Sequence, residues 1–299
     1  MKLAATISNV GQFFNMDETL ERLHDIGYRY ADIGLGGSDK FSKDEKEWKT
    51  AVSNLAETAA KRGIKFVQAH SPNYRITDES RSEVEYFMTQ RSIEICDMLG
   101  IENVVVHTGY NPANDKDAYF EKNRNYYRQF FPLMEKTGVN ILVENTLRYH
   151  ISKGGYYLLK GTDYVEFLEY VNHPLLNAVW DTGHGSAEGC QYENVTAIGK
   201  YLKGLHVHDN NGLSDQHAMP YTGVLNLDAL ISGLIDIGYK GYFTYETTYP
   251  LIPGGRAKRI PFEKDKRLFD PTPEMQIAAE KLLFTIGKCA LEAYGIYEE

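Results

Sequence analysis

In Leu176-Asn-Ala-Val-Trp-Asp181-Thr-Gly-His184 an apolar run ends in ionisable side chains, and this pattern is the key to the fold. The same order recurs along the chain: a short apolar run, a polar end, and then an amphipathic stretch. Short runs rich in β-branched and aromatic residues are typical of buried strands, and amphipathic stretches of ten or more residues are typical of helices. The pattern predicts strands and helices that alternate.

Eight strand–helix units can be counted in this way. The predicted strands are Lys2–Ser8, Tyr28–Leu35, Ile64–Ser71, Asn103–Thr108, Asn140–Thr146, Leu176–His184, Leu202–Asp209 and Gly241–Thr248. The predicted helices are Asp17–Ile26, Ser42–Arg62, Thr77–Leu99, Asp117–Lys136, Thr162–Val171, Glu193–Lys200, Leu227–Ile237 and Thr272–Tyr294. Eight units predict an α/β fold, the (β/α)8 TIM barrel, in which parallel strands form a closed inner wall.

A doubly wound open sheet is the rival architecture, and it requires a glycine-rich phosphate turn after an early strand. The one candidate, Gly34-Leu-Gly36-Gly37, has the wrong spacing and opens no helix. No Ser/Gly-rich linker or abrupt change of composition divides the 299 residues. We therefore expect residues 1–299 to form one domain.

Composition narrows the class of protein. The formal charge of −9 disfavours nucleic acid and anionic membranes as partners. Three cysteines, an odd number without short spacings, indicate neither a disulfide framework nor a cysteine zinc site. No signal peptide and no apolar run of the ~18 residues that a membrane span needs is evident. We expect a cytoplasmic protein without membrane contact.

The ends of the predicted strands carry the chemistry. Active sites of TIM barrels lie where strands end. Successive strands, from the third to the eighth, end in His70, His107, Glu144, Asp181, His206 and Glu246. The first four of these positions are each 37 residues apart, which places them at equivalent heights on neighbouring strands. Their side chains are therefore expected to converge.

Such a cluster predicts a metal site. Carboxylates gathered in a barrel mouth would repel one another and would be costly to desolvate. A divalent cation is the simplest compensation, and mixed imidazole and carboxylate ligands suit Zn²⁺ or Mn²⁺ better than Mg²⁺ or Ca²⁺.

At these positions the chain resembles the xylose isomerase-like barrels, which include sugar isomerases, epimerases and endonuclease IV. The resemblance implies that Glu144, Asp181, His206 and Glu246 hold one metal ion. His206 is preferred to His208 because the family's ligand lies three residues before an acidic or polar residue, as in His206-Val-His208-Asp209. His208 lies on the same strand face by the two-residue period, so it stays the alternative.

The resemblance extends to further ligands. Asp181-Thr-Gly-His184 resembles the family's Asp-x-x-His, whose histidine contacts substrate or a second metal. Asp215-Gln-His217 resembles the Asp-x-His of a third zinc in endonuclease IV. With His70 and His107 added, all nine ligand types of that site have a counterpart, so one to three metal ions are expected.

The first functional hypothesis is a metal-dependent isomerase or epimerase of carbohydrate metabolism, acting on a sugar or sugar phosphate. The metal would polarise a carbonyl and lower the barrier to an enediolate. The resemblance implies that Glu144 and Glu246 exchange protons at carbon and that His184 orients the substrate. His70, His107 and Arg148 are further substrate-binding candidates. The epimerase pattern has a second glutamate where this chain has His150, so the identity of the sugar does not follow.

Two other activities use similar chemistry. The ligand set also fits a zinc phosphodiesterase like endonuclease IV, although the charge of −9 disfavours DNA. A basic stretch, Arg256–Arg267, could bind a substrate phosphate or carboxylate or form a contact in a homo-oligomer. A lyase that dehydrates an inositol-like ketone, as inosose dehydratases do, is the third possibility.

Overall fold

The computed structural model describes residues 1–37, 39–72, 82–146, 155–186, 190–251 and 271–299. Within them, eight parallel strands form one sheet in the order β7-β6-β5-β4-β3-β2-β1-β8. A parallel bridge between Val207 and Tyr245 joins β7 to β8 and closes the ring. The strands are β1 (Lys2–Thr6), β2 (Tyr30–Gly34), β3 (Lys65–His70), β4 (Asn103–Val105), β5 (Asn140–Glu144), β6 (Leu176–Asp181), β7 (Leu202–His206) and β8 (Tyr242–Thr244).

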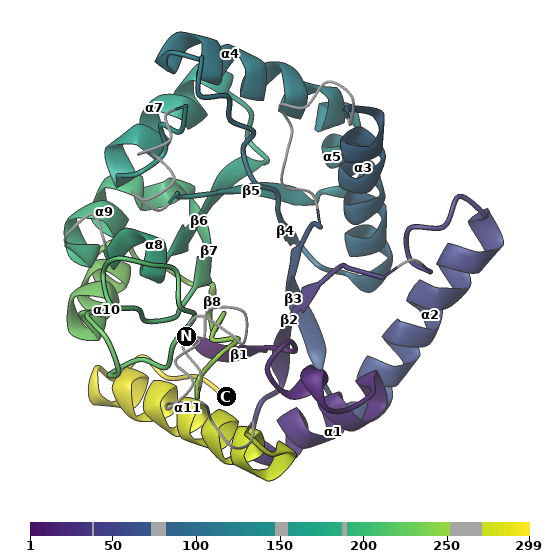
Figure 1. Cartoon of the computed structure of the whole chain (residues 1–299), viewed down its shortest axis with the longest axis vertical. Helices are drawn as coiled ribbons and strands as arrows, with labels where there is room; N and C mark the ends of the chain where they lie inside the picture. The colour runs from purple at the N-terminus through teal and green to yellow at the C-terminus, as the bar shows by residue number, and fades with distance from the viewer. Residues whose placement is uncertain (38, 73–81, 147–154, 187–189, 252–270) are drawn as a thin grey trace, which may run out of the picture.

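Helices surround this ring, as Figure 1 shows. The α-helices are α1 (Met16–Ile26), α2 (Glu45–Arg62), α3 (Ser82–Leu99), α4 (Lys116–Tyr127), α5 (Phe131–Thr137), α7 (Gly161–Val171), α8 (Thr182–Ser186), α9 (Gln191–Ile198), α10 (Leu227–Asp236) and α11 (Pro273–Ala293). Short 3₁₀ turns are η1 (Val10–Gln12), η3 (Arg128–Phe130) and η4 (Gly199–Tyr201). No helix in these described ranges combines the length and the apolar character that a membrane crossing requires. The predicted (β/α)8 TIM barrel is confirmed.

Most strands are shorter than predicted, and in two predicted elements the difference has a local cause. The strand predicted to run to His184 ends at Asp181, because the Asp181 carboxylate accepts the backbone N–H of His184 at 2.6 Å and starts the short helix α8. The single helix predicted from Asp117 to Lys136 is two helices, α4 and α5, separated by η3. Pro132 lies at the start of α5, where its missing N–H costs no helical hydrogen bond.

The barrel interior beneath the carboxyl ends of the strands is filled by side chains. Val105, Leu142 and Val179 form a separate buried apolar cluster there. Gln68 donates a hydrogen bond across the interior to the carbonyl oxygen of Leu205, at 3.2 Å. Gly204 gives Gln68 its room, since a Cβ at position 204 would lie 2.4 Å from the amide oxygen of Gln68. The side chains of these residues fill the barrel interior directly below the site.

A buried carboxylate on α11, far from the strand ends in sequence, makes stability depend on pH. Glu280 is 1% exposed and accepts a hydrogen bond from the side-chain amide of Asn9. Burial raises the pKa of Glu280 from 4.5 to about 7. The fold therefore favours the neutral acid, and this preference is lost as the pH rises from the unfolded-state pKa to the folded one.

We expect Glu280→Gln to remove this pH dependence. As the pH rises from 4.5 to 8, the free energy of unfolding of the variant should increase by about 3 kcal/mol relative to that of wild type. Urea unfolding followed by circular dichroism at several pH values measures the difference. A constant difference between the two proteins across this range would show that Glu280 does not titrate as described.

Candidate metal centre

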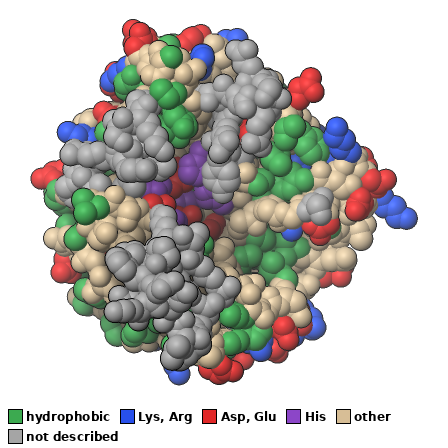
Figure 2. Space-filling view, viewed as in Figure 1, with side chains coloured by type: hydrophobic (Ala, Val, Ile, Leu, Met, Phe, Trp, Pro, Cys, Tyr) green, Lys and Arg blue, Asp and Glu red, His purple; other side chains and the backbone are tan. Residues whose placement is uncertain are grey.

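The ionisable strand ends meet at one edge of the barrel. His70, Glu144, Asp181 and His206 are the last residues of β3, β5, β6 and β7. His107 and Glu246 lie two residues beyond the ends of β4 and β8. In the space-filling view, histidine and acidic side chains gather in the central hollow of this face (Figure 2). The convergence predicted from the 37-residue spacing is therefore present in the structure.

The central group consists of Glu144, Asp181, His206 and Glu246. One potential ligand atom from each lies within 4.8 Å of the others. Nδ1 of His206 is 3.3 Å from a carboxylate oxygen of Glu144, 3.3 Å from one of Glu246 and 4.0 Å from one of Asp181. These four are the residues that the resemblance implied as the ligands of one metal ion.

A second group shares Glu144 with the first and adds two histidines. Nε2 of His107 lies 3.0 Å from Nε2 of His70 and 3.2 Å from Oε2 of Glu144. His70 is 3.6 Å from the same carboxylate oxygen. The three residues could together hold an ion.

A third group lies on the loop after β7 and on Glu246. His208, His217 and Glu246 bring one potential ligand atom each within 4.8 Å of the others. The rings of His208 and His217 stack with their centroids 4.2 Å apart. Asp215 connects this loop to the centre, because its Oδ2 is 3.1 Å from His217 and 3.6 Å from His184.

The central group fits a divalent cation. Both ring nitrogens of His206, Oε2 of Glu144 and Oε2 of Glu246 have no well-aligned hydrogen bond within the described ranges. His206 is fully buried and Glu144 is 3% exposed. Buried polar atoms are normally paired, since leaving one unpaired costs ~1–3 kcal/mol. An ion bound between these oxygens and Nδ1 of His206 would satisfy all of these atoms except Nε2 of His206.

The two glutamates of the central group have opposite pKa shifts. Burial raises the pKa of Glu246 to about 7, against the attraction of His206 and His217. Burial also opposes ionisation of Glu144, but the nearby His107 and His206 outweigh it and hold the pKa of Glu144 well below its usual range. One carboxylate is therefore ionised at neutral pH, while the other is close to its midpoint.

The histidines of the centre also have pKa shifts in opposite directions. Burial lowers the pKa of His107 to about 4, which leaves its ring neutral and able to act as a ligand. For His206 and His217, the attraction of neighbouring carboxylates outweighs burial and raises each pKa to about 10. These shifts describe the metal-free centre, in which protons carry the positive charge that an ion would supply.

Hydrogen bonds hold the carboxylate of Asp181 and its strand in place. Nε2 of His208 lies 2.9 Å from Oδ2 of Asp181. The side chain of Asn145 donates to the carbonyl of Asp181 at 2.8 Å and accepts its N–H at 2.7 Å. Gly183 allows this packing, because a Cβ there would lie 2.0 Å from His208.

Sequence reasoning missed part of this arrangement. It treated His208 only as the alternative to His206, whereas the structure places both in the centre with different neighbours. The two-residue period could have assigned both to the barrel interior. Asn145 carries no comparable signal in the sequence. Arg148, His150 and the basic stretch Arg256–Arg267 lie outside the described residues.

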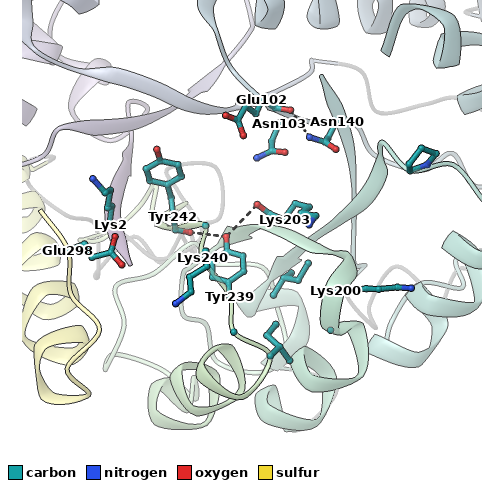
Figure 3. A pocket seen from close by; sticks show the side chains of 16 residues that line it. Lys2, Glu102, Asn103, Asn140, Lys200, Lys203, Tyr239, Lys240, Tyr242 and Glu298 are labelled. Carbon is teal, nitrogen blue, oxygen red and sulfur yellow. Dashed lines mark hydrogen bonds between the residues drawn. The ribbon is translucent and has the colours of Figure 1, made fainter. Parts of the chain in front are cut away.

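A cavity of about 800 Å³ lies at the other end of the barrel, where the strands begin (Figure 3). Its lining includes the lysines Lys2, Lys200, Lys203 and Lys240 and the carboxylates of Glu102 and Glu298, but no histidine. Barrel chemistry is placed at the carboxyl ends of strands. The candidate active site is therefore the polar hollow of Figure 2.

Comparison with known proteins agrees with this geometry. The family model of the xylose isomerase-like TIM barrel matches residues 20–266. The chain belongs to the xylose isomerase-like TIM barrel family. The expected resemblance is thereby confirmed for most of the chain.

Proteins with related sequences include one without a named activity and one with such an activity. An uncharacterized protein of Methanocaldococcus jannaschii is 28% identical over 154 residues, which are 50% of this chain and 51% of that protein. The chain thus spans about half the length of this relative. The fructoselysine 3-epimerase of Shigella flexneri is 24% identical over 234 residues, 74% of this chain and 81% of the enzyme.

Solved structures of the xylose isomerase-like barrel superpose over most of the chain. D-psicose 3-epimerase, solved in the presence of D-fructose, has a TM-score of 0.75 at 15% identity and covers 97% of this chain and 99% of its own. A family 2 AP endonuclease from Brucella melitensis has a TM-score of 0.68 at 16% identity, with 84% and 93% covered. At such identities these likenesses establish the shared fold alone.

Proposed function

We propose that the chain is a metal-dependent sugar isomerase or epimerase that works by proton transfer at carbon. The observation that carries this proposal is the placement of Glu144 and Glu246, two carboxylates that each lie 3.3 Å from the same nitrogen of His206. The fructoselysine 3-epimerase of Shigella flexneri, matched over 74% of the chain, supports a carbohydrate as the substrate.

Glu144, Asp181, His206 and Glu246 would hold one divalent ion, Mn²⁺ or Zn²⁺. When bound, that ion supplies Lewis-acid polarisation of a substrate carbonyl. Asp181 and His206 are fully buried and Glu144 is 3% exposed, and burial strengthens electrostatic interactions at this place.

The two glutamates are suited to opposite halves of a proton transfer. In the metal-free centre Glu144 is ionised and Glu246 has a pKa of about 7. Glu144 is therefore the candidate base that removes a proton from the carbon beside a carbonyl, and Glu246 is the candidate acid that returns one. Groups whose environments separate their pKa values are a typical acid–base pair. Delivery to the opposite face of the carbon would invert its configuration.

The histidines around this pair would bind and orient the sugar. Nδ1 of His184 is 2.9 Å from the carbonyl oxygen of Asn145, and this contact fixes the orientation of the ring. His70 and His107, 3.0 Å apart, line the other side of Glu144. Imidazole nitrogens can donate or accept hydrogen bonds, so they suit a polyhydroxyl ligand.

The direct test is exchange of carbon-bound protons with solvent. We expect the wild-type protein with Mn²⁺ to incorporate deuterium from heavy water into at least one member of a panel of ketoses, aldoses and their phosphates. Product analysis by NMR distinguishes an isomer or epimer from the dehydrated product of a lyase. Exchange without formation of an isomer or epimer, or no exchange on any sugar, would contradict the proposal.

A second candidate function is a zinc phosphodiesterase like endonuclease IV. The specific observation in its favour is that three ligand groups, and not one, lie around the barrel mouth. Three metal ions could activate water and stabilise a leaving oxygen.

Metal content separates the two candidates. For protein purified without added metal, we expect one equivalent of Mn²⁺ or Zn²⁺ per chain, measured by inductively coupled plasma mass spectrometry. Close to three equivalents of zinc, together with cleavage of an oligonucleotide carrying an abasic site, would replace the isomerase proposal by the phosphodiesterase. Chelation followed by dialysis is expected to abolish sugar turnover, and added Mn²⁺ to restore it.

A further inference from the structure

One buried carboxylate of the barrel interior has no part in the three ligand groups. Asp32 lies on β2, in register with Gln68 of β3. Partners in register on neighbouring strands share a face, and the Gln68 side chain crosses the interior to Leu205. Asp32 therefore points into the barrel, one layer below His70, which follows Gln68 by two residues. Asp32 is 3% exposed.

Asp32 and His206 each have an unused hydrogen-bonding atom. Oδ1 of Asp32 and Nε2 of His206 make no hydrogen bond with any described residue. Among charged neighbours, His206 exerts the largest attraction on Asp32, which opposes the rise in the pKa of Asp32 caused by burial. The negative charge of Asp32 in turn contributes to the raised pKa of His206. The ring of His206 stacks on the ring of His70, with centroids 5.6 Å apart, and His70 lies one layer above Asp32. The side chains of Asp32 and His206 are thus neighbours across the two layers.

The orientation of the His206 ring leaves Nε2 available for an outer partner such as Asp32. Its Nδ1 is directed to Glu144 and Glu246 at 3.3 Å, so its Nε2 is directed away from the group that would bind metal. A histidine that binds a metal through one nitrogen almost always donates its other N–H to a carboxylate, a carbonyl or a water. That partner selects the tautomer and holds the ring in position.

We propose that Asp32 is a positioning residue of the metal centre, which receives the Nε2–H of His206 through one bridging water and so holds Nδ1 toward Glu144 and Glu246. A water is assigned because no direct hydrogen bond joins Oδ1 of Asp32 to Nε2 of His206, and a site with polar groups on both sides accommodates one. The inference rests on the proposed function, since it requires an ion bound by His206.

Metal binding by purified protein tests this role without any substrate. Outer partners of metal-binding histidines typically contribute ~10–100-fold to metal affinity. We therefore expect Asp32→Ala to weaken Mn²⁺ binding by that factor, measured by the EPR signal of free Mn²⁺. Asp32→Asn, which keeps an accepting oxygen but loses the charge, should weaken it less. In the Co²⁺-loaded protein, both variants should shift the visible absorption bands.

Glu280→Gln is the matched control, because it neutralises a buried carboxylate on α11 that hydrogen-bonds to Asn9 and belongs to none of the three ligand groups. It should leave Mn²⁺ affinity and the cobalt spectrum unchanged. Should Asp32→Ala fail to fold, Asp32→Asn still reports both quantities. Affinities within twofold of wild type and an unchanged cobalt spectrum in the Asp32 variants would overturn the inference alone. No Mn²⁺ binding by wild type would overturn the proposed metal-dependent function, and this inference with it.

Discussion

Replacing Glu246 by glutamine is expected to abolish exchange of the substrate's carbon-bound proton with solvent. The amide keeps an oxygen that can bind a metal ion, so metal content should fall less than activity does. Basicity is lost entirely, and general acid–base groups typically contribute ~10²–10⁴-fold to rate. In the proposed reaction Glu246 returns a proton to the substrate carbon, and a glutamine side chain cannot do so.

The measurement is deuterium incorporation by wild type and Glu246→Gln on the same sugars, with metal content determined in both. Glu280→Gln serves as the matched control, since it makes the same chemical change at a buried carboxylate outside the site. Substrate affinity should change less than the exchange rate. Exchange at the wild-type rate by a metal-loaded Glu246→Gln protein would remove Glu246 from the mechanism.

Replacing Glu144 by glutamine is expected to affect both metal binding and stability. Glu144 belongs to the central group and to the group of His70 and His107, so a neutral amide weakens two potential sites together. Its carboxylate also lies 3.3 Å from the fully buried His206. Removing one partner of a buried charged pair costs ~3–5 kcal/mol, because the other charge is left uncompensated.

Urea unfolding of the metal-free proteins at pH 8, with a chelator present, measures the stability term, and titration calorimetry with Mn²⁺ measures binding. At this pH the Glu280→Gln control is expected to shift stability in the opposite direction, because it removes an ionised carboxylate from an apolar site. A Glu144→Gln protein that is as stable as wild type and binds Mn²⁺ equally well would refute the central role given to Glu144.

The strand ends were predictable because a parallel barrel repeats one unit. A period of 37 residues in the sequence placed His70, Glu144 and Asp181 on the last positions of three strands, and the structure has them there. Strand lengths were less predictable. β4 ends at Val105, so His107 reaches the site from the following loop, and a side-chain cap ends β6 at Asp181. Such endings depend on local hydrogen bonds that no periodic pattern contains.

The register between strands, and the neighbours that each side chain has across the barrel, could not be predicted from the sequence. Whether His206 or His208 faces Glu144 depends on the register of β7 against β6, which pairs Asp181 with His206 and includes an irregularity at Ala178. Both histidines share one face by periodicity, so only that register separates their neighbours. Asp32 was overlooked because a single acidic residue inside an apolar strand gives no indication of what lies across the barrel.

The order of eight strand–helix units and the residue types at their ends were predictable from the sequence, because hydrophobic periodicity is a local property of the chain. Only the tertiary structure decided which of those side chains share a hydrogen-bonding partner, and which carboxylate is ionised. A pKa depends on burial and on charges within a few ångströms, and in a barrel those charges come from strands that are 37 to more than 100 residues away. Glu144 and Glu246, chemically the same residue type, acquire opposite pKa shifts for this reason alone.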